Sequence, residues 1–154
     1  MKLVFYCNTG LVSALIKWQT RSPYSHVAVL VENNHRPFFV EAWWGGVRKR
    51  EGHSEDVGNI FDVYDLDLTP EQEDTAGIFL VNQIGKPYDF TMVARFVSRR
   101  QASRASRGKW FCSELAFAAA RKGGVHLLKN VEPWEVSPGG LSRSPLLTKI
   151  TEDE

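Results

Sequence analysis

Three residues of this 154-residue chain carry side chains that together could break an amide or ester bond: Cys112, His26 and Glu41. A cysteine thiolate is a strong nucleophile, an imidazole exchanges protons near neutral pH, and a carboxylate can hold an imidazole in one orientation. In chain order the three run His, Glu, Cys. The chemistry therefore depends on elements that bring distant positions together.

Cys112 stands at the start of the most clearly predicted helix, which we expect over residues 111–121. An apolar stripe and two terminal glycines define this helix: Phe111, Leu115, Ala118, Ala119, Gly123 and Gly124. Unpaired N–H groups and the dipole at a helix N-terminus favour a thiolate, and they could also stabilise an oxyanion. A buried structural cysteine is the alternative interpretation.

His26 and Glu41 fall on two neighbouring predicted strands, over residues 26–32 and 37–43, joined by a turn at residues 33–34. In such a hairpin the two side chains are rough cross-strand neighbours. Glu41 could then hold one nitrogen of the His26 ring and leave the other for the cysteine. The alternatives are a structural histidine and a surface glutamate on an edge strand.

The remaining pattern predicts one α+β domain over residues 1–154, with more strands and helices around the hairpin. Strands are expected over residues 2–7, 47–50 and 60–66, and helices over residues 11–18, 69–85 and 87–97. Leu11, Leu15 and Trp18 are spaced to share one face of the first of these helices. The residues after Gly124 are rich in turns and end in an apolar run at 146–150.

Three segments are similar, in order and composition, to a known family: SPYSHVAVL, FFVEAWWGGV and KWFCSEL. They resemble the permuted papain-like branch of the NlpC-type cell-wall peptidase superfamily, particularly its YiiX-like amidase and hydrolase members, over about residues 1–140. The resemblance implies a circularly permuted papain-like α+β fold, with an antiparallel sheet packed against a helix that bears the nucleophile. It also implies that Cys112 is the nucleophile, His26 the base and Glu41 the third polar member.

Four aromatic residues near these motifs are candidates for substrate binding: Tyr24, Trp43, Trp44 and Tyr88. The two tryptophans could form an aromatic wall beside the thiol. Tyr24 could place a hydroxyl near the oxyanion, and the segment GKPYDF around Tyr88 resembles the stretch that precedes the nucleophile helix in the family. Packing within the core is the alternative for each of them.

A basic segment over residues 95–109 carries no acidic side chain and is expected to be a mobile loop. Its arginines could make a weak contact with an anionic surface: Arg95, Arg99, Arg100, Arg104 and Arg107. A solvated loop without a partner is the alternative. The net charge of the whole chain is only +1, so no nucleic-acid partner is expected.

The sequence gives no sign of a metal site or a cofactor, because His35, His53 and His126 lack ligand spacing and no nucleotide-binding motif is present. Two cysteines are too few for a disulfide scaffold, although one disulfide between Cys7 and Cys112 stays open. No signal peptide or apolar run long enough to span a membrane is seen, and a cytoplasmic location is expected.

We therefore expect a thiol-dependent hydrolase that cleaves an amide or ester bond through a thioester on Cys112. Its substrate would be a peptide, a peptidoglycan-derived molecule or an acylated small molecule. Acyl transfer in place of hydrolysis is one alternative. Others are a non-catalytic binding or scaffold module on the same fold, and a metal-dependent enzyme that uses His26 and Glu41.

Overall fold

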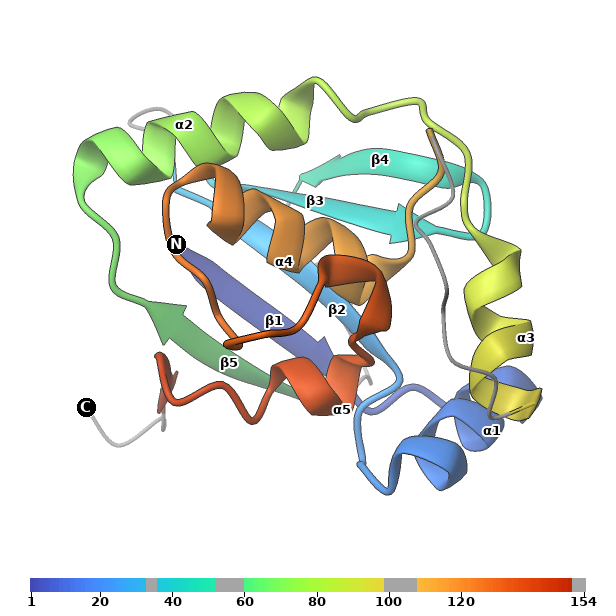
Figure 1. Cartoon of the computed structure of the whole chain (residues 1–154). Coiled ribbons are helices and arrows are strands. Elements are labelled where there is room, and N and C mark those ends of the chain that lie inside the picture. The colour runs from blue at the N-terminus through green and yellow to red at the C-terminus, as the bar shows by residue number, and fades with distance from the viewer. Residues whose placement is uncertain (33–35, 52–59, 99–107, 151–154) are drawn as a thin grey trace.

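A six-stranded antiparallel sheet forms the centre of the computed structural model, with strand order β4-β3-β2-β1-β5-β6 (Figure 1). The strands are β1 (Lys2–Tyr6), β2 (His26–Val31), β3 (Phe38–Trp43), β4 (Gly46–Glu51), β5 (Phe61–Leu66) and β6 (Leu147–Ile150). The structure describes residues 1–32, 36–51, 60–98 and 108–150, with the backbone alone at 96–98. The expected hairpin of β2 and β3 is confirmed.

In the described part of the chain, four helices and two shorter helical segments accompany the sheet. They are α1 (Leu11–Thr20), α2 (Pro70–Val81), α3 (Phe90–Ser98), α4 (Cys112–Lys122), the 3₁₀ helix η2 (Pro133–Glu135) and α5 (Pro138–Leu141). Within the described residues, no helix is both long and apolar enough to cross a bilayer. The helices α2 and α4 lie across one face of the sheet, while α1 and α3 meet beyond one end of it (Figure 1).

The main core lies between this face of the sheet and α4. Strand residues such as Phe5 and Val29 meet Leu115 and Phe117 of α4, and all four are almost fully buried. Burying a large apolar side chain contributes about 1.5–3 kcal/mol. The helix that begins at Cys112 is therefore rigidly held.

The opposite face of the sheet has a different cover. Tyr6, Ala28 and Phe39 form a small buried cluster there, and the guanidinium carbon of Arg50 lies 4.4 Å from the centre of the Phe39 ring. Because side chains alternate along a strand, Glu41 points to this same face as Phe39. A charged carboxylate is thus placed where arginines, and not only apolar groups, can surround it.

The helix expected at residues 11–18 is present as α1, but the shared face of its apolar residues points outward. Leu11 is 82% exposed and Trp18 is 66% exposed, whereas Ile16 is the buried residue of this helix. Spacing predicts which residues share a face, and it cannot say whether that face meets a core.

The expected basic loop needs a correction at its start. Arg95 lies in the last turn of α3 and not in a loop, because the helical pattern of residues 90–98 continues through it. Its positive charge suits the C-terminal end of a helix, where the dipole is negative. The other arginines of that segment, Arg99, Arg100, Arg104 and Arg107, lie outside the described residues.

Candidate active site

Cys112 is the first residue of α4, and its thiol is almost buried, at 2% exposure. The start of the helix is fixed by Glu114, whose carboxylate accepts a hydrogen bond from the Phe111 N–H at 3.3 Å. The Phe111 side chain has no atom that can accept a hydrogen bond in return, so only one of the two hydrogen bonds of a capping box forms. Ser113 holds the same turn by donating its hydroxyl to the Val136 carbonyl at 2.7 Å.

His26 is the first residue of β2 and sits in the sheet beside β1, where it pairs with Tyr6. The preceding Ser25 N–H donates to the Tyr6 carbonyl at 3.0 Å, which fixes the chain as it enters the strand. The His26 ring is 6% exposed. One ring nitrogen, Nε2, lies 2.7 Å from Oε2 of Glu41, and Cys112 lies close enough to the ring to help raise its pKa. Because Glu41 engages Nε2, Nδ1 is the nitrogen available to the sulfur.

Glu41 is held from two sides although it is only 2% exposed. Its Oε2 faces His26, and its Oε1 accepts hydrogen bonds from Arg48 at 2.9 Å and from Arg50 at 3.3 Å. Arg48 lies directly opposite Glu41 in the β3–β4 pairing, and Arg50 lies one diagonal step away. Arg50 also donates to the Tyr6 hydroxyl at 2.9 Å, which fixes its guanidinium.

This pairing decides the charge of both partners. Burial disfavours the charged form of His26, but hydrogen bonds to Cys112 and Glu41 outweigh it and raise the pKa of His26 to about 9. Burial likewise opposes ionisation of Glu41, but His26 and the two arginines overcome it and lower the pKa of Glu41 to about 2. At neutral pH the structure therefore favours an imidazolium beside a carboxylate.

Aromatic side chains surround the ring of His26 and the start of α4. Trp43 packs edge-on against His26, with 4.9 Å between ring centres. Tyr88 contacts Phe111 and Trp44, and burial followed by the charge of Cys112 raises the pKa of its phenol. Among the expected substrate-binding residues, Trp43, Trp44 and Tyr88 are thus at the site.

Gly46, where β4 begins, explains how Tyr88 reaches this position. Gly46 has φ +115°, and a Cβ there would lie 2.6 Å from the carbonyl oxygen of Lys86. This close approach lets the Val47 N–H donate to that carbonyl at 2.8 Å, while the Gly85 N–H donates back to Val47 at 2.8 Å. The segment that leads to Tyr88 is thereby tied to the hairpin that carries Glu41.

Tyr24 is placed differently from the other aromatic candidates. Its hydroxyl hydrogen-bonds Asp62 and the Tyr64 hydroxyl on β5, and its ring packs against Phe5. Its side chain is therefore a packing and hydrogen-bonding element between β2 and β5. Both cysteines are free, so the disulfide considered for Cys7 is absent.

Four polar residues near the site were not singled out from the sequence: Arg48, Arg50, Asp89 and Glu114. The arginines have a readable signal, because the Gly-Gly turn sets Arg48 across from Glu41. Asp89 is fully buried, and its Oδ2 has no hydrogen-bond partner among the described residues. Burial raises the pKa of Glu114 to about 7, with Asp89 adding to the effect. Nothing in the sequence distinguished this buried acidic pair.

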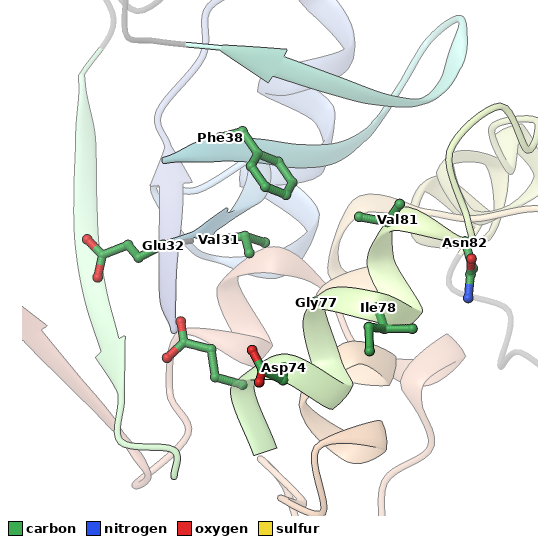
Figure 2. A pocket seen from close by; sticks show the side chains of 9 residues that line it. Val31, Glu32, Phe38, Asp74, Gly77, Ile78, Val81 and Asn82 are labelled. Carbon is green, nitrogen blue, oxygen red and sulfur yellow. The ribbon is translucent and has the colours of Figure 1, made fainter. Parts of the chain in front are cut away.

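The cavity that opens on His26 is small. It has a volume of about 30 Å³ and is bounded by Trp43 and Trp44 at the end of β3, by Tyr88 and by Val12 and Ile16 of α1. A larger cavity of about 240 Å³ lies elsewhere, where Phe38 and Val31 of the sheet face α2 (Figure 2). Val31 is at the opposite end of β2 from His26, about 16 Å along the strand.

Comparisons with known proteins support the fold. No protein-family model matches the chain, and no curated protein matches it. A solved structure is similar over nearly its whole length: metalloprotein YiiX from Escherichia coli O157:H7, described as DUF1105. The two share 22% sequence identity with a TM-score of 0.79, and the match covers 99% of this chain and 96% of that one. The chain therefore has a YiiX-like fold.

Proposed function

We propose that the chain is a thiol-dependent hydrolase, which cleaves an amide or ester bond through a thioester on Cys112. One observation carries the proposal. The Cys112 thiol at the start of α4 lies close enough to the His26 ring to help raise its pKa, and Nε2 of that ring lies 2.7 Å from the buried carboxylate of Glu41. A nucleophile, a proton carrier and a residue that orients the carrier are thus in contact.

In the first step the sulfur of Cys112, its proton held by His26, attacks the carbonyl carbon of the substrate. A C–S bond forms, and the carbonyl oxygen becomes an oxyanion. Backbone N–H groups of the first turn of α4, which have no acceptor within the helix, are available to stabilise that charge. As the C–N or C–O bond breaks, the leaving group takes the proton from His26, and a thioester remains.

In the second step water attacks the thioester. The neutral His26 ring accepts a proton from the water, an oxyanion forms again, and the C–S bond breaks to release the acid. The proton remains on the imidazole beside the freed sulfur, so the starting state is restored. If an amine or alcohol replaces water, the same thioester gives acyl transfer, which is the alternative outcome.

The order of the residues along the chain supports a permuted papain-like arrangement. A papain-type site needs a cysteine at a helix N-terminus and a histidine on the facing sheet. In this chain His26 and Glu41 on β2 and β3 come before the helix of Cys112. We propose that the fold is a circular permutation within the NlpC-type superfamily.

The similar solved structure is named a metalloprotein, but the donor set in this chain does not fit a metal. Both carboxylate oxygens of Glu41 already accept hydrogen bonds, one from two arginines and one from the His26 ring. The donor atoms left for a metal are then the sulfur of Cys112 and one nitrogen of His26. Zinc sites in proteins use three or four protein ligands, so two are too few. Within the described part of the chain, no three His, Cys, Asp or Glu side chains form a metal-binding group.

The shape of the site bears on the substrate. The cavity of about 30 Å³ beside His26 has aromatic walls, which suit an acyl chain or an extended peptide. Acylated small molecules and peptides, including peptidoglycan-derived ones, remain the proposed substrate classes.

Intact-mass spectrometry with p-nitrophenyl acetate tests the proposal. The expected product is a single acetyl group on Cys112, which is lost over time as the thioester hydrolyses. Cys112→Ala should not form the adduct, and His26→Gln should form it much more slowly. Cys7→Ala is the matched control and should react as the wild type does, because burial and Asp62 raise the pKa of the Cys7 thiol.

Two results would overturn the catalytic proposal. One is acetylation that persists in Cys112→Ala, and the other is alkylation of Cys112 by iodoacetamide at a rate that His26→Gln does not change. In either case a non-catalytic binding module on the same fold becomes the better interpretation. Activity that a chelator abolishes would instead contradict the argument from the donor set.

A further inference from the structure

The outward face of α1 carries three apolar side chains in contact with solvent. Leu11 is 82% exposed, Trp18 is 66% exposed and Leu15 is 37% exposed. They are spaced by four and three residues, so they form one continuous stripe along the helix. We call this stripe the α1 face. A contiguous exposed apolar patch of this kind marks an interaction site more often than scattered single residues do.

The α1 face lies on the outer side of the helix whose inner side lines the candidate active site. The inward side of the same helix, through Val12 and Ile16, lines the cavity that opens on His26. On the other side of this cavity Trp44 contacts Phe90, with 5.7 Å between the centres of the tilted rings, and the two residues are 47% and 53% exposed. Figure 1 shows α1 and α3 side by side at this end of the sheet. Exposed apolar groups therefore flank the cavity on both sides.

Four cationic side chains lie at this end of the molecule. Lys17 and Arg21 lie at the end of α1, and Arg95 lies at the end of α3. Arg143 is exposed and donates a hydrogen bond to the Arg21 carbonyl at 3.3 Å, which brings one more cation to this end. The sequences of α1 and α3 contain no aspartate or glutamate. An apolar stripe with basic residues near its end complements an anionic lipid surface.

We propose that the α1 face is a membrane-docking surface, which inserts Leu11, Leu15 and Trp18 at the headgroup boundary of an anionic bilayer. The basic residues at the ends of α1 and α3 then lie at the level of the phosphates. Leucine and tryptophan are the side chains that suit this position, since one supplies apolar area and the other an amphipathic ring. Docking in this way holds the cavity at His26 near the lipid surface, with α1 between the two. It does not depend on the chemistry at Cys112.

Vesicle co-sedimentation of the full chain tests this surface. The probe is phosphatidylcholine vesicles with about one-third phosphatidylglycerol, compared with pure phosphatidylcholine. The test variant is Leu11→Gln with Trp18→Gln, since glutamine keeps helix propensity and removes the apolar contact. The matched control is Ile78→Gln with Val81→Gln on α2. Those two residues are 64% and 46% exposed and line the larger cavity of Figure 2.

The wild type should bind the anionic vesicles, and added salt should weaken the binding. The α1 variant should lose about tenfold in affinity or more, while the α2 control keeps it. Far-UV circular dichroism and an unchanged urea midpoint show that both variants are folded. The proposal is wrong if the wild type does not bind, or if both variants lose binding equally. It is also wrong if light scattering shows a wild-type dimer that the α1 variant dissociates, because a second copy would then cover the face.

Discussion

Glu41→Gln is the sharpest perturbation of the candidate site, because it removes one charge and keeps the shape of the side chain. The amide can still accept a hydrogen bond from an arginine. It can no longer balance the imidazolium of His26 or the guanidinium of Arg50, whose side chain is 6% exposed. We expect the pKa of His26 to fall well below its wild-type value, because burial then opposes its charge with only Cys112 in support.

The size of the expected stability loss follows from the His26–Glu41 pair. The rise in the pKa of His26 from 6.5 to about 9 corresponds to about 3 kcal/mol, at about 1.4 kcal/mol for each pH unit. The fall in the pKa of Glu41 from 4.5 to about 2 is of similar size. Both shifts contain the same His26–Glu41 interaction, so they must not be added. Removing one member of a buried pair costs about 3–5 kcal/mol, and this is the loss expected for Glu41→Gln near pH 6.

The stability contributed by His26 and Glu41 depends on pH in opposite directions. The contribution of His26 is complete below pH 6.5 and is lost as the pH rises through about 9, because the unfolded chain releases its proton first. The contribution of Glu41 is complete above pH 4.5 and is lost as the pH falls towards about 2. The stability difference between wild type and Glu41→Gln should therefore be largest between these limits and narrow on both sides.

Urea unfolding across this pH range measures the difference, and NMR titration of the His26 ring measures its pKa directly. Glu51→Gln is the matched control on the same hairpin. Its carboxylate is 65% exposed and pairs with Lys49 at 3.1 Å, so its loss should cost about 0.5 kcal/mol or less. The reasoning is refuted if wild-type His26 titrates at or below 6.5, or if the two variants lose equal stability at every pH.

Three further substitutions test how the site is built. Gly46→Ala should lower the free energy of unfolding in urea by about 2 kcal/mol, because φ at Gly46 is +115° and an added Cβ would meet a backbone oxygen. Gly45→Ala is the control and should change the stability little, because there is open space around its Cβ. Equal losses in the two variants would contradict this. Between pH 5 and pH 8 the stability of Glu114→Gln should rise by about 1–3 kcal/mol relative to the wild type, because ionisation of the Glu114 carboxyl destabilises the wild-type protein as the pH rises through about 7. A stability difference that does not change with pH would refute this. Ser113→Ala should cost about 1–3 kcal/mol by leaving a buried carbonyl without its partner, and a neutral result would show that water replaces the hydroxyl.

Much of the fold could be predicted because local signals agree with the tertiary contacts. Thr69 and Gln72 form a capping box and Pro70 occupies the first position of α2, and these residue types at this spacing are usual signals for the start of a helix. The helix of Cys112 is clear because its apolar stripe and its terminal glycines agree. For the same reason the adjacency of His26 and Glu41 could be inferred from a hairpin with a short turn.

The features of the fold that could not be predicted depend on which face of a helix or strand packs against the rest of the protein. Leu11, Leu15 and Trp18 were correctly expected on one side of a helix, but only the packing of α1 shows that this side faces solvent. Arg50 carries a charge that suggests a surface position, yet it lies buried between Glu41 and Tyr6. Local patterns contain no information about such long-range neutralisation of charge.

The surroundings of Glu41 also limit what it could do in the proposed reaction. A carboxylate bonded to His26, Arg48 and Arg50 stays ionised until the pH approaches about 2, so it cannot take a proton in a cycle near neutral pH. Its role would be to hold the imidazole ring and to favour its charged form. Proton transfer is thereby confined to Cys112, His26 and the substrate. A rate profile governed by Glu41 would contradict this division of roles.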